Sequence, residues 1–407
     1  TTRLVGSEMC IRDRCNIIPS GICDTALITS LSIGDSVTSI EEDAFKNNYY
    51  LNTINIENIE RFGWIDFKST PQSGRSLYHN GKLISEVEIT EGSISENAFS
   101  GVRGIERVII GKEVVSVNSN AFSHCDDLIS VQVDGEEIEW GDNVFSDNPK
   151  LRSFIASNLN SMGENFLSNC PEIKDLSCPE LKKMGDYALM NCINLKDLSC
   201  SKLSAIGNHA LSGTSLYTIK LPLIKDLGDY AFAGCPELTE VILGCKTRRL
   251  GNSVFNNCNR LNSITIESLI PPTAYNDSFD NYSYVNTTLK TPDISMEEYK
   301  ATAPWSDFFD ISGVALDYLE YNGCIYYKED AIAILISVMD KNTKTLEIPD
   351  TLAINDNVIS VVDFINGCFN ELENLQILRI PSGFTELPEI NNIKTLEEVY
   401  LNNPAVI

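Results

Sequence analysis

The cysteines are the side chains with the widest range of chemistry in this sequence, and there are thirteen of them. Thiolates bind zinc when they are spaced as Cys-x-x-Cys or gathered with histidines, and two thiols that meet can form a disulfide. The sequence has no Cys-x-x-Cys pair, and its three histidines, His79, His124 and His209, lie in separate segments. We therefore expect no metal site, and we expect buried, reduced thiols instead of a disulfide framework.

Motifs of known catalytic sites are also missing. The sequence contains no Gly-x-Ser-x-Gly, Walker loop, His-Glu-x-x-His or dinucleotide-binding glycine fingerprint, and its 57 acidic residues are scattered. A general acid/base pair needs two carboxyl groups in one water-excluded pocket. We therefore expect no catalytic residues and no cofactor, and we interpret the chain as not an enzyme.

The charge limits the kinds of partner. With 31 basic and 57 acidic residues, the formal charge is −26. Phosphate backbones and anionic lipids attract Lys and Arg, so this composition argues against nucleic acid and against an anionic membrane surface. The longest apolar run, residues 331–339, is much shorter than the ~20 residues that a transmembrane helix needs, so we expect no transmembrane segment.

An internal repeat of about 22 residues organises the chain. Position 0 of each unit is an apolar anchor, found at Ile40, Ile94, Val117, Trp140, Met162, Met184, Ile206, Leu227 and Leu250. Gly follows six of these anchors, and a small-then-large pair such as Ala231-Phe232 stands four and five residues after the anchor. Only Phe166-Leu167 departs from that order. Positions 11, 14 and 16 are apolar, and the alternation at the end of this stretch is typical of a half-buried strand.

Units this short cannot bury an apolar face alone, but stacked neighbours can. The pattern predicts an α/β repeat solenoid. We expect a right-handed leucine-rich-repeat array, with short parallel strands on one face and short helical or 3₁₀ turns on the other.

Residues 229–238, DYAFAGCPEL, resemble the repeat of the BspA-like leucine-rich repeat proteins, a bacterial cell-surface family. Residues 77–83 resemble the family's inserted hairpin, in which Asn80-Gly81 favours a type I′ turn. Residues 296–300, with Trp305 and Phe308, resemble the module that closes an array.

This resemblance implies a non-catalytic interaction module, extracellular or at the cell surface, that binds a protein or glycan partner in the manner of an adhesin. It also implies a monomer. Two alternatives stay open at this point: a structural spacer that displays other domains, and a fragment of a larger enzyme whose catalytic domain is missing.

The domain organisation follows from where the repeat starts and stops. Residues 1–14 are interpreted as an artefactual tail, because 4–14 resemble translated sequencing-adapter sequence. Residues 15–267 are expected to form the array, with a hairpin insertion at about 63–88. Residues 268–318 are expected to be the closing module, and 319–407 the start of a second, truncated array.

The repeat register also assigns the cysteines and a binding surface. Cys125, Cys170, Cys192, Cys235 and Cys258 stand eight residues past their anchors, where a small polar side chain can bond backbone groups of the turn, and Cys178 and Cys200 occupy core position 16. Outward positions 13 and 15 of the strands are expected to face a partner. The residues chosen there are Asp175, Ser177, Asp197, Ser199, Thr218, Lys220, Glu240, Ile242 and Thr265.

Overall fold

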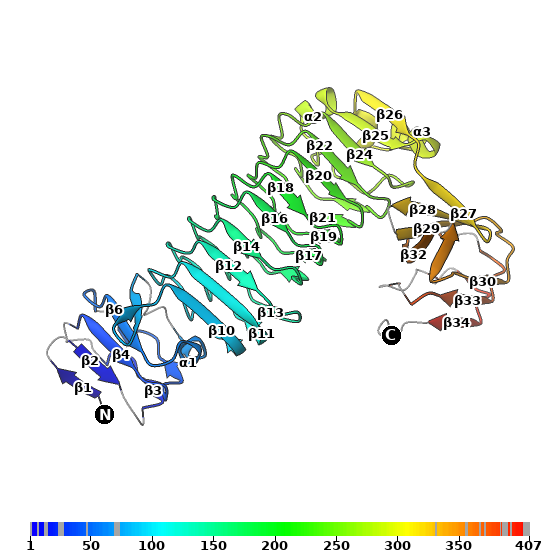
Figure 1. The fold of residues 1–407 in the computed structure, drawn as a ribbon. Helices are drawn as coiled ribbons and strands as arrows, with labels where there is room; N and C mark the ends of the chain where they lie inside the picture. The colour runs from blue at the N-terminus through cyan, green and yellow to red at the C-terminus, as the bar shows by residue number, and fades with distance from the viewer. Residues whose placement is uncertain are drawn as a thin grey trace.

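The alternation at positions 13 to 16 forms a strand in each repeat. In β12 (Ser130–Val133), the side chains of Val131 and Val133 are buried, and those of Ser130 and Gln132 are half-buried. The computed structural model describes residues 2–5, 8–11, 15–22, 28–45, 48–68, 74–329, 332–354, 357–365, 368–369, 372–382, 384, 390 and 393–401. Along most of this length the chain forms an elongated stack of similar coils, and its last part folds back beside the stack (Figure 1).

The strands at positions 13 to 16 stack into a long, mostly parallel ladder that is divided into four sheets. In ladder order the strands are β1 (Thr2–Val5), β2 (Glu8–Ile11), β4 (Ser30–Ile33), β6 (Thr53–Ile56), β8 (Ser76–His79) and β9 (Lys82–Leu83); β10 (Glu86–Ile94), β11 (Arg107–Val117), β12 and β14 (Ser153–Ile155); β16 (Asp175–Ser177) and β18 (Asp197–Ser199); and β20 (Thr218–Leu221), β22 (Glu240–Leu243), β24 (Ser263–Ile266), β25 (Thr288–Pro292) and β26 (Asp310–Val314). The pairs β1–β2 and β8–β9 are antiparallel. The β8–β9 turn has positive φ at both Asn80 and Gly81, as a type I′ turn requires.

A second parallel ladder forms at the anchors themselves. Its strands are β3 (Ile17–Ile18), β5 (Ser39–Ile40) and β7 (Asp66–Phe67), then β13 (Glu139–Trp140), which pairs with β11, and finally β15 (Ser161–Met162), β17 (Lys183–Met184), β19 (Ala205–Ile206), β21 (Asp226–Leu227) and β23 (Arg249–Leu250). Each coil therefore contributes two strands, one to each ladder. The fold is a β-solenoid of stacked parallel strands.

The helical or 3₁₀ turns that were expected after each anchor are not found in the described part of the array. From residue 95 to residue 261 the segments that follow the anchors are turns, with neither α-helix nor 3₁₀ helix. Positions 3 and 7 past the anchor have positive φ, for example 55° at Asn143 and 57° at Asp147. Residues in this left-handed region interrupt the run of right-handed φ/ψ angles that a helix needs, so the α/β description does not fit the array.

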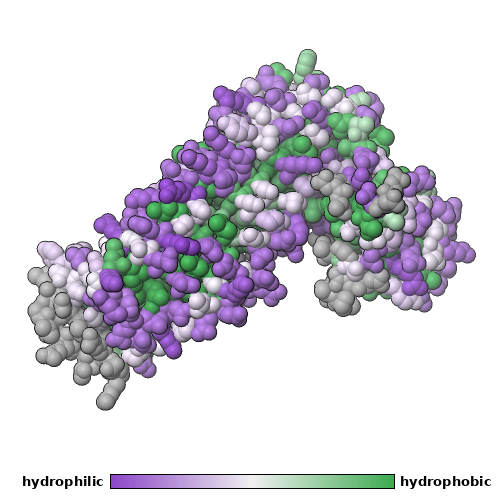
Figure 2. Space-filling view, viewed as in Figure 1, coloured by the Kyte–Doolittle hydropathy of each residue, from purple (hydrophilic) through white to green (hydrophobic). Residues whose placement is uncertain are grey.

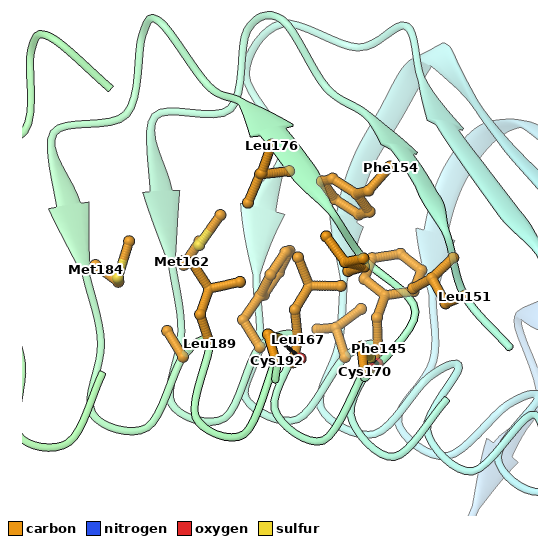
Figure 3. Packing of buried hydrophobic residues seen from close by; sticks show 14 of the residues in the cluster. Phe145, Leu151, Phe154, Met162, Leu167, Cys170, Leu176, Met184, Leu189 and Cys192 are labelled. Atoms are coloured by element: carbon orange, nitrogen blue, oxygen red, sulfur yellow. Dashed lines mark hydrogen bonds between the residues drawn. The ribbon is translucent and has the colours of Figure 1, made fainter. Parts of the chain in front are cut away.

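The core lies between the two ladders and the turns. Large side chains five residues past the anchor stack along the array, with ring centroids 5.0 Å apart for Phe99 and Phe122 and 5.5 Å for Phe122 and Phe145. Phe166, the departure in the pattern, is also fully buried, and its ring meets that of Phe145 edge to face at 5.6 Å. Leu167, Cys170 and Cys192 pack beside these rings (Figure 3).

Short helices lie at both ends of this array. They are α1 (Ile59–Gly63), α2 (Asn281–Asn286), η1 (Asp293–Ser295), α3 (Met296–Ala301) and η2 (Trp305–Asp307). At the C-terminal end, the Tyr299 hydroxyl donates to the Ser268 carbonyl at 2.8 Å and the Trp305 indole N–H donates to the Pro272 carbonyl at 2.9 Å. Both rings are fully buried, so residues 288–314 cover the end of the apolar core that would otherwise meet water.

The chain from Tyr318 onward has its own apolar core. One sheet, in the order β27 (Tyr318–Tyr321), β28 (Cys324–Glu329), β29 (Ile332–Val338), β32 (Asn357–Phe364) and β31 (Thr351–Ile354), is mainly antiparallel. A parallel ladder of β30 (Thr345–Glu347), β33 (Ile377–Ile380) and β34 (Glu398–Leu401) lies beside it. We call residues 318–401 the C-terminal unit.

The interpretation of 4–14 as an adapter-derived tail falls partly outside the described residues, because 6–7 and 12–14 are not described. Residues 402–407, the last of the segment expected to begin a second array, lie outside them as well.

Candidate binding groove

The predicted partner-binding residues follow one another along the outer face of the first ladder. Asp175 pairs with Asp197, and Ser177 with Ser199, in the register of β16 and β18. Thr218 and Lys220 lie on β20, which pairs with β22, the strand of Glu240 and Ile242. Thr265 lies on β24 and pairs with Ile242. The first six of these nine side chains are exposed, whereas Glu240, Ile242 and Thr265 are half-buried.

A groove of about 1370 Å³ brings the six exposed residues together. Asp175, Ser177, Asp197, Ser199, Thr218 and Lys220 all line it, but Glu240, Ile242 and Thr265 do not. Its floor is the outer face of β14 to β20. Figure 2 shows apolar surface along the middle of the stack, bordered by hydrophilic surface.

One wall of the groove comes from the C-terminal unit, through Ile332, Val362 and Asp363. Two polar contacts between buried groups hold that unit in place. Lys246 of the array forms an ion pair with Asp363, with only 5% and 10% of these side chains exposed, and the Tyr327 hydroxyl donates to a Glu267 carboxylate oxygen at 2.7 Å. Cys245 of the array packs into the core of the C-terminal unit. The wall is therefore part of the packed structure.

The lining of the groove also carries cations that the choice of positions 13 and 15 missed. Lys182, Lys202 and Lys225 lie in the segments between the two ladders, Lys183 is the first residue of β17, and Arg152 directly precedes β14. Their signal in the sequence is the cluster of lysines just before the anchors Met184, Ile206 and Leu227. In a chain of charge −26, such a local excess of positive charge can attract an anionic ligand.

Two carboxylates lie side by side on the floor. Asp175 and Asp197 pair in register on neighbouring parallel strands, which are about 4.8 Å apart. Like charges at that distance repel each other, so this pair costs stability. Locally unfavourable choices of this kind concentrate at functional surfaces.

The cysteines that stand eight residues past the anchors, here called the turn column, donate hydrogen bonds to backbone carbonyl groups, as predicted. The Sγ atom of Cys192 donates to the Leu167 carbonyl of the preceding coil at 3.2 Å, and that of Cys125 donates to the Phe99 carbonyl at 3.1 Å. Asn148, in the same column, donates to the Phe122 carbonyl at 3.0 Å. Within the described residues these cysteines are free thiols, and burial raises the pKa of Cys125 and Cys192 to about 12. Such thiols are poor nucleophiles at neutral pH.

The histidines do not meet in a site. Among the described residues, no group of three or more His, Cys, Asp or Glu side chains is placed to hold a metal ion. His209 instead stacks between two tyrosines on the turn side, with ring centroids 5.0 Å from Tyr187 and 4.7 Å from Tyr230. The described part of the chain also has no helix long and apolar enough to span a membrane.

Comparison with known families decides what these coils are. The model of the BspA-type leucine-rich repeat region matches residues 16–74, 72–196 and 182–300, with six copies of the repeat. These ranges cover more than half of the chain and span the repeats described above.

The chain belongs to the BspA-type leucine-rich repeat family.

One solved structure of low sequence identity supports the leucine-rich-repeat fold. A leucine-rich repeat protein from Bacteroides ovatus is 17% identical, with 98% of this chain and 97% of that chain covered and a TM-score of 0.50. The pneumococcal vaccine antigen PcpA is 15% identical over 78% of this chain and 88% of its own, with a TM-score of 0.44. A leucine-rich cell surface protein from Faecalibacterium prausnitzii is 15% identical over 99% and 95%, with a TM-score of 0.36. No curated protein matches the sequence.

Membership of the BspA-type family, with its leucine-rich repeats, identifies the chain as a protein-interaction module. The groove combines concavity with exposed polar side chains on a floor of paired strands, as a preformed recognition site does.

Proposed function

We propose that this chain is a non-catalytic, monomeric interaction module that binds a protein or glycan partner in the groove. We further propose that it acts outside the cell or at the cell surface, in the manner of an adhesin. The observation that carries the proposal is the groove itself, because one volume of about 1370 Å³ gathers six residues chosen from the repeat register alone.

The chemistry of the lining supports binding and not catalysis. The carboxyl groups of Asp175 and Asp197 are exposed to water on the groove floor, so they lack the water-excluded setting that acid/base catalysis needs. The serine and threonine hydroxyls beside them can exchange hydrogen bonds with a ligand, and the strands beneath are held by buried apolar side chains such as Leu176 and Ile219. A floor already ordered by strand pairing keeps the ordering cost of binding low.

The domain division is part of the same proposal. We propose that residues 15–267 form the binding array with a hairpin insertion at about 63–88, that 268–318 close it, and that 319–407 begin a second array. Support comes from the hydrogen bond and the ion pair that fix the C-terminal unit against the last coils of the array. In this arrangement the second array supplies a wall of the first array's site.

A screen of immobilised extracellular-matrix proteins and glycans tests the proposal. The wild-type chain is expected to bind at least one surface, and the double variant Ser177→Trp/Ser199→Trp is expected to lose that binding because two indoles fill the groove floor. Glu172→Trp/Ile193→Trp is the matched control, since both of its positions are exposed and lie outside the groove lining.

Circular dichroism and thermal unfolding must show that both variants keep the fold. Binding by the wild type that survives in Ser177→Trp/Ser199→Trp contradicts the assignment of the site. Absence of binding to every surface favours the alternative role of a structural spacer.

A further inference from the structure

The groove reverses the charge of the rest of the molecule. Apart from the Lys246–Asp363 ion pair, its lining includes six basic side chains and only two acidic ones, Asp175 and Asp197. The basic side chains are Arg152, Lys182, Lys183, Lys202, Lys220 and Lys225. Over the whole sequence acidic residues outnumber basic ones by 57 to 31, so this excess is local to the groove.

The two signs of charge are separated along two neighbouring coils of the groove. In the order of the chain, Asp197 comes first on β18, Ser199 follows at its end, and Lys202 stands in the segment beyond. The preceding coil repeats this order with Asp175, Ser177 and the pair Lys182 and Lys183. In these two coils the groove passes from carboxylates through hydroxyls to lysines, and with Lys225 of the next coil these lysines form its basic edge. Arg152, which precedes β14, and Lys220, on β20, lie outside that edge.

Backbone hydrogen bonds fix the basic edge in place. The Ser204 N–H donates to the Lys182 carbonyl at 2.9 Å, and the Lys225 N–H donates to the Ser204 carbonyl at 2.8 Å. These three residues therefore occupy equivalent positions in successive coils, and Lys182 and Lys225 are roughly 10 Å apart along the array. Lys202 pairs with Glu180 at 2.7 Å and is exposed, so a ligand carboxylate can compete for it.

The lining also contains apolar groups, and these favour an acidic peptide over an anionic glycan as the ligand. Ile155 is 57% exposed at the end of β14, and Leu223, Ile332 and Val362 line the groove toward the C-terminal unit. A sulfated or uronic-acid glycan has no side chain to bury there. A peptide has both acidic and apolar side chains, and in extended form it presents them on alternate sides.

We propose, building on the proposed function, that the groove binds an extended acidic peptide segment of a partner protein, with its carboxylates against the Lys182–Lys225 edge and its apolar side chains against Ile155, Leu223 and Val362. The floor from β14 to β20 spans four strands, or roughly 15 Å, which an extended chain covers with about five residues. Positive charge along the edge steers such a segment into the groove and sets its direction of approach.

Fluorescence anisotropy with a labelled peptide of about eight residues, composed of Glu, Leu and Ser, tests the proposal on the full chain. The variant Lys182→Glu/Lys183→Glu is expected to weaken binding at least about tenfold at low salt, with the loss shrinking as salt rises. Asp175→Asn/Asp197→Asn has the opposite expected sign: it strengthens binding severalfold, because it removes the carboxylates that repel the peptide. A bulk effect of charge is controlled by Lys82→Glu/Lys112→Glu, which makes the same charge change at exposed sites outside the groove and is expected to leave binding unchanged.

Two results overturn the acidic-peptide proposal. One is tighter binding of heparin, used as the sulfated glycan probe, than of the peptide. The other is equal binding of the peptide by wild type and Lys182→Glu/Lys183→Glu. If the peptide does not bind but Ser177→Trp/Ser199→Trp still abolishes capture of another ligand, this inference fails and the proposed function stands. If neither the tryptophan nor the charge variants change any binding, both fail.

Discussion

At the scale of single residues, side chains at the same repeat position make the same hydrogen bond in successive coils. The thiols eight residues past the anchors donate to carbonyl groups of the preceding coil. The side chains two residues past the anchors accept hydrogen bonds from backbone N–H groups of the next coil. For example, the Asn208 N–H donates to Asp186 Oδ1 at 2.7 Å, and the Asp229 N–H donates to Asn208 Oδ1 at 2.8 Å. The cysteine column was predictable because register alone places it beside unsatisfied backbone groups. The left-handed residues were not predicted, although the frequent Asn, Asp and Gly at positions 3 and 7 carried that signal.

The buried thiols predict how stability depends on alkaline pH. Burial raises the pKa of Cys125, Cys178, Cys192 and Cys200 from 9.0 to about 12. Between these values the unfolded chain releases protons that the folded chain keeps, so the free energy of unfolding falls as pH rises. Across this pH range each thiol lowers the free energy of unfolding by at most about 1.4 kcal/mol per pH unit. Its stabilising contribution is fully present below the pKa of the unfolded chain.

Urea unfolding at increasing alkaline pH measures that slope. The variant Cys178→Ala/Cys200→Ala is expected to show a shallower loss of stability than the wild type, because two of the titrating groups are gone. The same slope in both proteins would mean that other groups, such as the tyrosines, cause the alkaline loss.

At the scale of the element, the glycine after the anchor sets how closely the coils stack. A Cβ atom at Gly207 would lie 2.6 Å from the Asp186 nitrogen and from the Gly185 carbonyl carbon, well inside van der Waals contact. The sequence showed the glycines at a regular spacing but not their purpose, because close approach is a property of two coils and not of one. The second ladder was missed for a related reason: its strands of two residues, such as β17, are too short to show a period.

The glycine column predicts a steric cost. Gly207→Ala is expected to lower the free energy of unfolding by about 1–3 kcal/mol, because backbone atoms of the preceding coil must move. Ser95→Ala, at the equivalent position of a coil without glycine, is expected to cost less than about 1 kcal/mol. Urea unfolding of both variants checks the difference, and equal costs would show that the glycines are not needed for stacking.

At the scale of the whole molecule, the groove depends on a contact that no sequence pattern displays. Lys246 and Asp363 are far apart in the chain, and neither stands at a repeat position that signals pairing. The floor of the site could be predicted from the repeat register, but its wall could not, because the docking of the C-terminal unit is a tertiary event. The same register also proposed Glu240, Ile242 and Thr265, which lie outside the groove because they are on β22 and β24, beyond its floor.

The buried ion pair predicts how the C-terminal unit can be released. Asp363→Asn removes the carboxylate from beside a Lys246 side chain that is 5% exposed, and is expected to cost about 3 kcal/mol. Limited proteolysis should then cut the C-terminal unit faster, and small-angle scattering should report a longer particle.

The double variant Lys246→Met/Asp363→Leu is the control, because an apolar pair of similar size avoids the buried charge and should keep the unit docked. Unchanged proteolysis in Asp363→Asn would show that the Tyr327–Glu267 hydrogen bond and apolar packing are sufficient.

The coil-to-coil hydrogen bonds of the turns have a consequence for how such a protein can change over generations. Because the side chains two residues past the anchor in several coils accept from the backbone N–H that stands in the next coil, the ladder has no preferred length. Duplication of one unit in the gene would therefore add a coil that forms the same hydrogen bonds. It would widen the distance between Ile155 and the C-terminal wall by about 4.8 Å. Repeat copy number would then act as a coarse setting for the size of ligand that the protein accepts, while point mutations at the basic edge would adjust its charge.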